Sequence, residues 1–488
     1  MARLVRRRRR NAERNSGRTI ASPQPVALPL RGYLADAGDG ELSTQFAAEL
    51  TNWRPHRTHI ETRETTQEVH PSSTVFRRFP FEFGAASYTV DVTPLQIDAQ
   101  GTTLSRAFSG DATAGYISGQ IVIVGKGGEP VTWNGTAFAT SAIVCDTGKD
   151  PAEFDGITVH QSRVMLWDTS SDLEFYYGDV GAVTGAFTRF PLSRLGNITG
   201  TILTASPMTL SDGEGTNDVF VIFTTSGQIV VYAGNNPGDA GAWEIVGRAQ
   251  TAPPLGRDAV VSVGGDLWIA TAAGVVKVSQ AMQEQETSQI APFSEAVAGD
   301  IETLAADTAA EWAMHLTADG QQVILNHRLA GVSRQFVYNF DLRAWHLTDH
   351  DIVRFYNLGR NTYFHDTGNA VHCFDRLTRT GALITAVFHT PWMRIGSDRS
   401  VTMIKPEIIG AGPMTVTVTV LGDHNQTAFD ISQATQTVTL QPDTPADPGG
   451  TVSLNEEVGC DAAGEVFQIR VEITASWAKI VNMTAFLQ

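Results

Sequence analysis

The feature that most constrains this chain is a β-hairpin pattern that returns several times along it. Residues 219–234 (VFVIFTTSGQIVVYAG) contain two runs of alternating apolar residues around a Thr-Ser-Gly turn. Such alternation buries one face of a strand, and Gly227 tolerates the positive φ that a tight turn requires. A similar pattern returns at 259–278 and, more loosely, at 361–375. The sequence therefore predicts a repeated antiparallel unit.

The repetition favours a ring of sheets. An isolated hairpin leaves its apolar face uncovered and its strand edges unpaired, whereas sheets stacked around a ring cover one another. Turn residues fall near positions 128, 171, 227 and 274, a spacing of about 43 to 56 residues that is close to one four-stranded blade. We predict an all-β chain with an irregular β-propeller of about six blades at 74–380. Five or seven blades, or a pair of sandwiches, are the alternatives.

The region before the propeller has a different composition. Residues 1–25 are rich in charge and then in proline, which predicts a disordered arginine-rich arm. Residues 26–73 are predicted to form an extended lead-in with one short helix at about 41–51. Within this segment we expect Trp53 to anchor the lead-in on the body of the protein.

Two further segments depart from the repeat. Residues 278–307 have helical spacing and few β-branched residues, so we expect a helical insertion in the propeller. Residues 381–488 contain clean two-residue alternation at 414–423 and 466–480. This pattern predicts a C-terminal domain of β-sandwich type, with a further blade as the alternative.

The net charge is unevenly distributed along the chain. The whole chain carries −17, while residues 1–18 contain eight arginines and one glutamate and so carry +7; residues 19–488 therefore carry −24. A basic arm on an acidic body indicates contact with nucleic acid or an acidic subunit, and a solvated tail is the alternative. The candidate interaction residues are Trp53 and the unbroken run Arg6, Arg7, Arg8, Arg9 and Arg10.

Motifs for covalent or nucleotide chemistry are sparse. Cys145, Cys373 and Cys460 lie far apart without a CxxC pair, which argues against a disulfide framework or a structural zinc site. The stretch 119–128 (GQIVIVGKGG) has the wrong length for a phosphate-binding loop and lacks its Ser/Thr, so it is interpreted as a hairpin turn. The sequence offers no GxSxG motif and no sialidase-type repeat, and paired carboxylates cannot be placed from it.

Histidines and aspartates gather in two places, which are His346, His350 and Asp351, and then His365 and Asp366. Both places lie between expected strands that are rich in aromatic residues, so we interpret them as polar neighbours of core side chains. The pair His56 and His59 gives no further indication. We therefore expect no enzymatic activity, no cofactor and no metal. A stretch of about 20 apolar residues, which a membrane span requires, is absent from the sequence.

The order of segments carries a family resemblance. The chain has a Pro-rich start with LPLRGYLAD, an Asn52-Trp53 lead-in that ends at Arg63, and irregular blades with a late copy at 256–275 (GRDAVVSVGGDLWIATAAGV). A terminal β-domain then closes on VFQIRVEITAS. In this organisation the chain resembles the tail nozzle (tail hub, tail tubular) proteins of short-tailed, podovirus-like bacteriophages. The resemblance covers most of the chain and depends on organisation, because no single motif is diagnostic.

The resemblance implies a structural protein of the virion, assembled in the cytoplasm of the bacterial host. It implies a homo-hexamer below the portal and the tail adaptor (head-to-tail connector), often with tail fibres or spikes attached. This ring would form the distal channel that retains genomic double-stranded DNA and conducts it during ejection. It implies no catalytic residues. An acidic channel would repel the DNA backbone, so DNA would slide through it, and we expect Arg6–Arg10 to contact an acidic adaptor ring or neighbouring subunit.

Two other functions compete with the nozzle. A carbohydrate-binding or glycan-cleaving propeller would act as a monomer. A receptor-binding tail spike would be a trimer with short β-helix repeats, and no short repeat is visible in the sequence.

Overall fold

The chain forms two compact units in the computed structural model. The structure describes residues 22–35, 45–63, 66–71, 74–83, 86–109, 111–170, 173–211, 216–283, 294–374, 383–423, 431–441 and 451–488. We call residues 66–340 and 349–375 the propeller unit. Residues 1–65, 341–348 and 376–488 make up the terminal unit.

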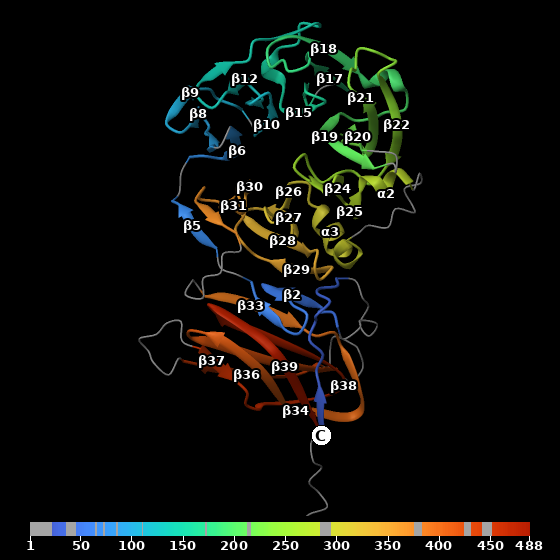
Figure 1. The fold of residues 1–488 in the computed structure, drawn as a ribbon. Helices are drawn as coiled ribbons and strands as arrows, with labels where there is room; N and C mark the ends of the chain where they lie inside the picture. The colour runs from blue at the N-terminus through green and yellow to red at the C-terminus, as the bar shows by residue number, and fades with distance from the viewer. Residues whose placement is uncertain are drawn as a thin grey trace, which may run out of the picture. The chain divides into compact units, whose positions relative to one another are not determined.

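The propeller unit consists of sheets arranged in a ring (Figure 1). Its first three sheets are β6 (Arg77–Phe83), β7 (Ala86–Val92), β8 (Gln96–Ala99) and β9 (Thr102–Ser105); β10 (Ala112–Ile117), β11 (Gln120–Gly125), β12 (Gly128–Trp133) and β13 (Phe138–Thr140); and β14 (Ile143–Cys145), β15 (Gly156–His160), β16 (Arg163–Trp167), β17 (Glu174–Tyr177) and β18 (Gly185–Pro191). Neighbouring strands in these sheets are antiparallel, apart from the parallel pair β14 and β18.

Three further sheets and one ladder continue the ring in chain order. The sheets are β19 (Ile202–Ser211), β20 (Thr216–Thr224), β21 (Gln228–Gly234) and β22 (Trp243–Gln250); β23 (Val260–Val263), β24 (Asp266–Thr271) and β25 (Gly274–Lys277); and β30 (Arg354–Leu358), β31 (Asn361–His365) and β32 (Val371–Cys373) with β5 (Gln67–His70). The ladder is β26 (Glu311–Leu316), β27 (Gln322–Leu329) and β28 (Val332–Asn339), and it lies between the last two sheets in sequence.

The ring is closed by pairing between the two ends of the propeller sequence. Strand β5, from the beginning of the unit, pairs antiparallel with β32 at its end, with Val371 opposite His70. Edge strands of neighbouring sheets also contact one another, namely β10 with β15, β15 with β19, β23 with β26, and β30 with β6. The prediction of an all-β chain with a propeller of about six blades is therefore confirmed as to fold, and the ring, as far as the structure describes it, consists of six sheets and the ladder β26–β28.

Successive sheets cover one another's apolar faces, as the hairpin repeat requires. Phe79 and Val90 of the first sheet pack with Ile121 and Trp133 of the second in one buried cluster. Equivalent clusters join the second sheet to the third, the third to the fourth, and the fourth to the fifth. The second, third and fourth sheets thus bury apolar side chains on both faces, which explains why many of their central strands are almost continuously apolar.

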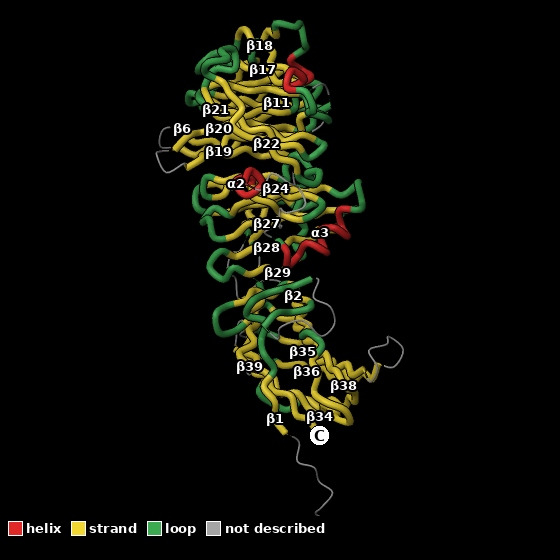
Figure 2. Tube along the Cα trace, turned by 90° about the vertical axis from the view of Figure 1, so that its right-hand side faces the viewer, coloured by secondary structure: helices red, strands yellow, loops and turns green. Residues whose placement is uncertain are grey.

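The opening hairpin has the predicted form. Strands β20 and β21 pair from Val219 opposite Ala233 to Phe223 opposite Ile229, and Gly227 has a φ of 85° at the turn. Within the expected insertion, the described helices are α2 (Val278–Gln283), which contacts β22, β24 and β25, and α3 (Ala298–Ala305), preceded by the 3-10 turn η4 (Glu295–Val297) (Figure 2). Two more 3-10 turns are η1 (Pro151–Glu153) and η2 (Leu192–Leu195).

The terminal unit combines strands from three parts of the sequence. Its strands are β1 (Ser22–Pro25), β2 (Glu49–Thr51), β3 (Trp53–Pro55), β4 (Ile60–Thr62), β29 (Ala344–Thr348), β33 (Ile384–His389), β34 (Met393–Ala411), β35 (Met414–Asp423), β36 (Ile431–Leu440), β37 (Thr451–Leu454), β38 (Val458–Ala475) and β39 (Trp477–Leu487). The pairing order is β29-β2-β33-β38-β34-β39-β4-β3, with β35 also on β38, β37 on β34 and β1 on β39. These strands form one connected pairing network, and the sandwich form stays a prediction.

Four expectations outside the propeller need correction. Residues 22–25, expected in the disordered arm, form β1, because they pair along β39 from Ser22 to Pro25. Residues 49–51, expected in a short helix, form β2 between β29 and β33. The single strand expected at 466–480 is interrupted at Ser476, which separates β38 from β39. The region 381–488 does not form a unit alone, since 376–488 clusters with 1–65 and 341–348.

A search of the described helices for a membrane span finds none of sufficient length and apolar character.

Candidate functional site

A cavity of about 340 Å³ opens among edge strands of the propeller sheets. Its walls come from β6, β15, β19, β23, β26 and β30, which are distant in sequence and adjacent in the ring. The apolar and hydroxyl part of the wall includes Ile157, Thr204 and Val261. The charged part includes Arg77 and Arg354, which begin β6 and β30, together with Arg257 and Asp258, which precede β23.

The charged group, which we call the axial cluster, consists of Arg77, Arg257, Arg354, Asp111 and Asp258. Oδ2 of Asp111 accepts from Arg77 Nη1 at 3.4 Å and from Arg354 Nη2 at 3.0 Å. Arg257 Nη2 lies 3.3 Å from the same oxygen. Both carboxylate oxygens of Asp258 accept from Arg77, at 3.2 and 3.4 Å. Residues separated by up to 277 positions are thus joined across the ring.

The surroundings keep these groups ionised. Burial would raise the pKa of Asp258, but the charges of Arg77 and Arg354 more than offset this and hold that pKa well below its ordinary value. Burial would likewise lower the pKa of Arg77, and the charges of Asp258 and Asp111 raise it instead. Both shifts favour the charged forms, so the axial cluster remains a set of ion pairs at neutral pH.

The neighbouring polar groups are also engaged. Arg354 lies 3.8 Å from Glu311, so three arginines face three carboxylates in this region. His315 lines the same cavity and shares a hydrogen bond of 2.8 Å with Asn357 Oδ1. Burial lowers the pKa of His315 to about 4, so its imidazole is neutral at pH 7.

This arrangement is suited to holding the ring together. Charges of opposite sign are matched, and the oxygens of Asp111 and Asp258 are directed to arginines of other sheets. A carboxyl group whose pKa is held low, as that of Asp258 is, is poorly suited to donate a proton as a general acid. We therefore interpret the axial cluster as a structural lock between sheets.

The candidate interaction residues fall in different places. Arg6, Arg7, Arg8, Arg9 and Arg10 lie outside the described residues. Trp53 lies in β3 and is completely buried in the terminal unit, so it packs inside the protein and is not accessible to a partner.

The histidines considered in the sequence do not form one site. His346 is buried in β29 of the terminal unit, whereas His350 and His365 are buried in the propeller unit. His365 packs beside Tyr356, with ring centroids 5.7 Å apart, and His350 packs beside Phe374 at 5.4 Å. Both are neighbours of core aromatics, as expected from the sequence.

Sequence reasoning missed the axial cluster completely. Its five members are scattered over the chain, and each one is an ordinary charged residue beside a strand. A possible signal is the position of Arg77, Asp111 and Arg354 at, or directly before, the first residues of β6, β10 and β30. That signal has meaning only once the strands are known to be the innermost ones of a ring.

Comparisons with known proteins add information on the fold alone. No protein-family model matches the chain, and no curated protein sequence matches it. Solved structures of similar fold include Saccharomyces cerevisiae Sqt1, at 8% identity and a TM-score of 0.40, covering 65% of this chain and 99% of that one. YCF48 bound to D1 peptide is similar at 10% identity and a TM-score of 0.38, with 67% and 95% covered. An exo-β-1,3-galactanase from Phanerochaete chrysosporium is similar at 13% identity and a TM-score of 0.27, with 77% and 95% covered. No site or activity follows from likenesses at this level.

Proposed function

We propose that six copies of this chain form the tail nozzle of a short-tailed bacteriophage, a channel that retains genomic DNA and then conducts it during ejection. The proposal rests on the resemblance in segment order and on one physical observation, the distribution of charge. Residues 19–488 carry −24 and residues 1–18 carry +7. A conduit for DNA must not bind the phosphate backbone, and an acidic body meets that requirement.

The propeller geometry supports a structural role. The ring is closed by β5 on β32, and the axial cluster joins its sheets through ion pairs. A module locked in this way can serve as a rigid wall element without undergoing chemistry. The terminal unit uses both ends of the described chain, since β1 pairs with β39. Strand pairing of this kind would resist separation of the chain ends under load.

The deciding experiment is to determine the oligomeric state of the purified full chain by electron microscopy and mass measurement. The proposal expects closed rings of six copies. It also expects weak binding of double-stranded DNA at physiological ionic strength, because repulsion by the acidic body dominates. A monomer that binds glycans would support the carbohydrate-binding alternative and overturn the nozzle. A stable trimer would overturn it in favour of a receptor-binding spike.

A further inference from the structure

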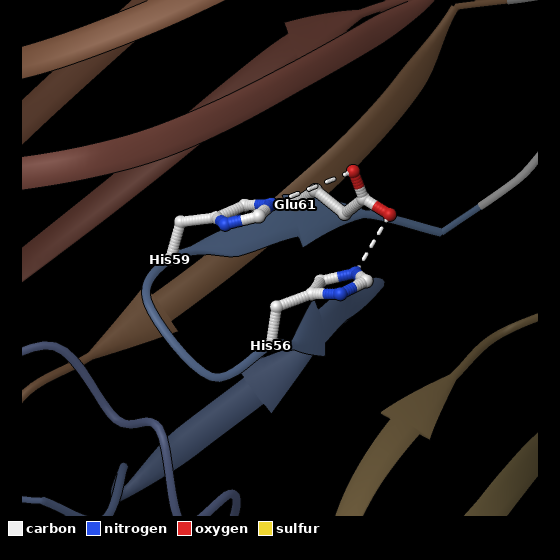
Figure 3. Close-up of side chains that lie close together, drawn as sticks. All are labelled: His56, His59 and Glu61. Atoms are coloured by element: carbon white, nitrogen blue, oxygen red, sulfur yellow. Dashed lines mark hydrogen bonds and ion pairs between the residues drawn. The ribbon is translucent and has the colours of Figure 1, made fainter.

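A second cluster of potential ligand atoms lies in the terminal unit, away from the axial cluster. His56, His59 and Glu61 project from one hairpin, formed by β3 and β4 (Figure 3). His56 follows β3, His59 precedes β4 and Glu61 lies within β4. The metal-binding atoms of the three side chains all lie within 4.8 Å of one another. Among the described residues this is the group whose His, Cys, Asp and Glu atoms converge in this way.

The hairpin backbone holds the three positions in place. The amide of His56 donates to the carbonyl of His59 at 2.8 Å, which closes a turn of only two residues between them. On its other side β4 pairs with β39, where Glu61 lies opposite Lys479. Ile60, between two of the ligand positions, is completely buried. A short turn on a paired strand is a rigid scaffold for ligands.

The three side chains contact one another, through a hydrogen bond between His56 and Glu61, and their ligand atoms lie near the spacing that a bound ion requires. Glu61 contacts both imidazoles, with Oε1 2.7 Å from His56 Nε2 and Oε2 3.9 Å from His59 Nε2. Ligand atoms around a tetrahedral zinc ion lie about 3.3 Å apart, given bond lengths near 2.0–2.2 Å. The imidazole rings are stacked with centroids 4.7 Å apart, so each must turn about χ2 to aim at a common ion. Their side chains are 35% and 26% exposed, which leaves room for that rotation.

The other nitrogen of His59 already has a partner. Nδ1 of His59 lies 3.2 Å from the hydroxyl oxygen of Thr58. When Nδ1–H donates to Thr58, the lone pair is on Nε2, which is the nitrogen that faces Glu61. A metal-ligating histidine usually has its second nitrogen fixed in this way. Thr58 therefore helps to fix the imidazole of His59 with Nε2 free to bind a metal ion.

The surrounding charges restrict the kind of metal. Arg54 and Lys479 act electrostatically on Glu61 and His59, so the site has no excess of negative charge. Hard cations such as Mg²⁺ and Ca²⁺ depend on several oxygen ligands and on net negative charge, neither of which is present. Ions that bind imidazole strongly depend less on net charge, and two imidazoles with one carboxylate are a known ligand set for Zn²⁺.

We propose that His56 Nε2, His59 Nε2 and the Glu61 carboxylate bind one first-row divalent metal ion of the Zn²⁺ type. Three protein ligands leave one coordination position, which is filled by water or by a group from another molecule. The ion would tie the turn between β3 and β4 and so stabilise the edge of the sheet, where β3 is the last strand of the pairing order. This proposal is independent of the nozzle, because it concerns one hairpin of a single chain.

The test is isothermal titration of the full-length protein, first freed of metal with EDTA, with ZnCl₂. One Zn²⁺ per chain is expected to bind, with a Kd of about micromolar or tighter. His59→Gln and Glu61→Gln should each weaken binding by at least tenfold. Glu61→Gln keeps the size of the side chain and so tests the ligand separately from the fold. At the same Zn²⁺ concentration, Zn²⁺ should also raise the melting temperature of the wild-type protein by more than that of Glu61→Gln.

The matched control is His70→Gln, which removes an exposed histidine of β5 in the propeller unit. This variant should bind Zn²⁺ like the wild-type protein. Equal affinities in the wild-type protein, His59→Gln and Glu61→Gln would overturn the proposal, as would the absence of saturable binding. Mg²⁺ should not compete with Zn²⁺, and competition at similar concentrations would contradict the assignment of metal type.

Discussion

At the level of single residues, the aspartates of the axial cluster are expected to make a large contribution to the stability of the propeller. One oxygen of Asp111 contacts Arg77 of β6, Arg354 of β30 and Arg257, which precedes β23. Asp111→Asn would leave buried arginines with one charged partner fewer. Because an uncompensated buried charge is costly, we expect the free energy of unfolding to fall by about 2–4 kcal/mol. Urea denaturation at pH 7 measures this loss.

The matched control for that substitution is an aspartate of a surface ion pair. Asp179 is 94% exposed and lies 3.8 Å from Arg163. Solvent screens such a pair, so Asp179→Asn should leave the urea midpoint unchanged. Equal effects of the two substitutions would show that the axial ion pairs do not stabilise the ring.

A buried histidine makes the propeller sensitive to mild acid. Burial and the nearby charge of Arg78 lower the pKa of His365 to about 4. Both ring nitrogens of His365 are buried without a hydrogen-bond partner. The unfolded chain takes up a proton near pH 6.5 whereas the folded one does so near pH 4, so stability is full above pH 6.5 and is lost as the pH falls. We expect this residue to account for a loss of about 2 kcal/mol at pH 5.

Replacing the histidine tests that account directly. His365→Leu removes the titrating group and two unsatisfied nitrogens, so the slope of unfolding free energy against pH should decrease by about one proton between pH 6.5 and 4. His70→Gln, at an exposed position, should leave the slope as it is. An unchanged slope in His365→Leu would mean that other groups govern the acid sensitivity.

At the level of elements, the turn between β20 and β21 depends on a missing side chain. Gly227 has a φ of 85°, and a Cβ at this position would collide with the backbone carbonyl of Thr251. Gly264 also has a positive φ, of 59°, but a Cβ there would meet no atom within 4 Å. Gly227→Ala should therefore destabilise the protein by about 2–4 kcal/mol, and Gly264→Ala by only about 1 kcal/mol. Thermal and urea unfolding of the two variants give the comparison, and equal losses would contradict the predicted collision.

Some strands could be predicted from the local sequence and others could not. Local alternation was sufficient for β35, predicted at 414–423 and found as Met414–Asp423, and for the hairpin around Gly227. It failed where a distant partner decides the conformation. Ser22–Pro25 has no apolar alternation and becomes a strand only by pairing with β39. Leu50 has a helix-like spacing from Phe46, yet β29 and β33 enclose its segment as β2.

The sites were harder to predict than the strands for the same reason. The sequence pattern did not indicate a site at His56 and His59, and it did not single out Glu61, because only a two-residue turn places all three on one hairpin. The axial cluster joins positions as distant as Arg77 and Arg354. The cluster exists only because the ring of sheets is closed, so no local sequence pattern could predict it.

At the level of the whole molecule, the proposed assembly has to reconcile repulsion with cohesion. Six copies at −17 each repel one another, and they repel DNA as well. The arginine-rich arm is the part of the chain with the opposite charge, so it is the natural source of attraction between subunits or to an acidic adaptor ring. Salt weakens both effects, since screening acts on repulsion and attraction alike.

The arm can be separated from the ring by deletion. Removing residues 2–18 takes away eight arginines and one glutamate and changes the charge per chain from −17 to −24. If the arm contacts the adaptor, rings of the truncated protein should still form but should bind adaptor complexes at least tenfold more weakly at low salt, with a smaller salt dependence. Replacing Arg6–Arg10 with lysines keeps the charge and controls for it, so binding by that variant should stay close to the wild-type protein. Normal attachment of the truncated protein to tails would show that the arm is not needed for assembly. Loss of the rings would instead show that the arm contacts neighbouring nozzle subunits.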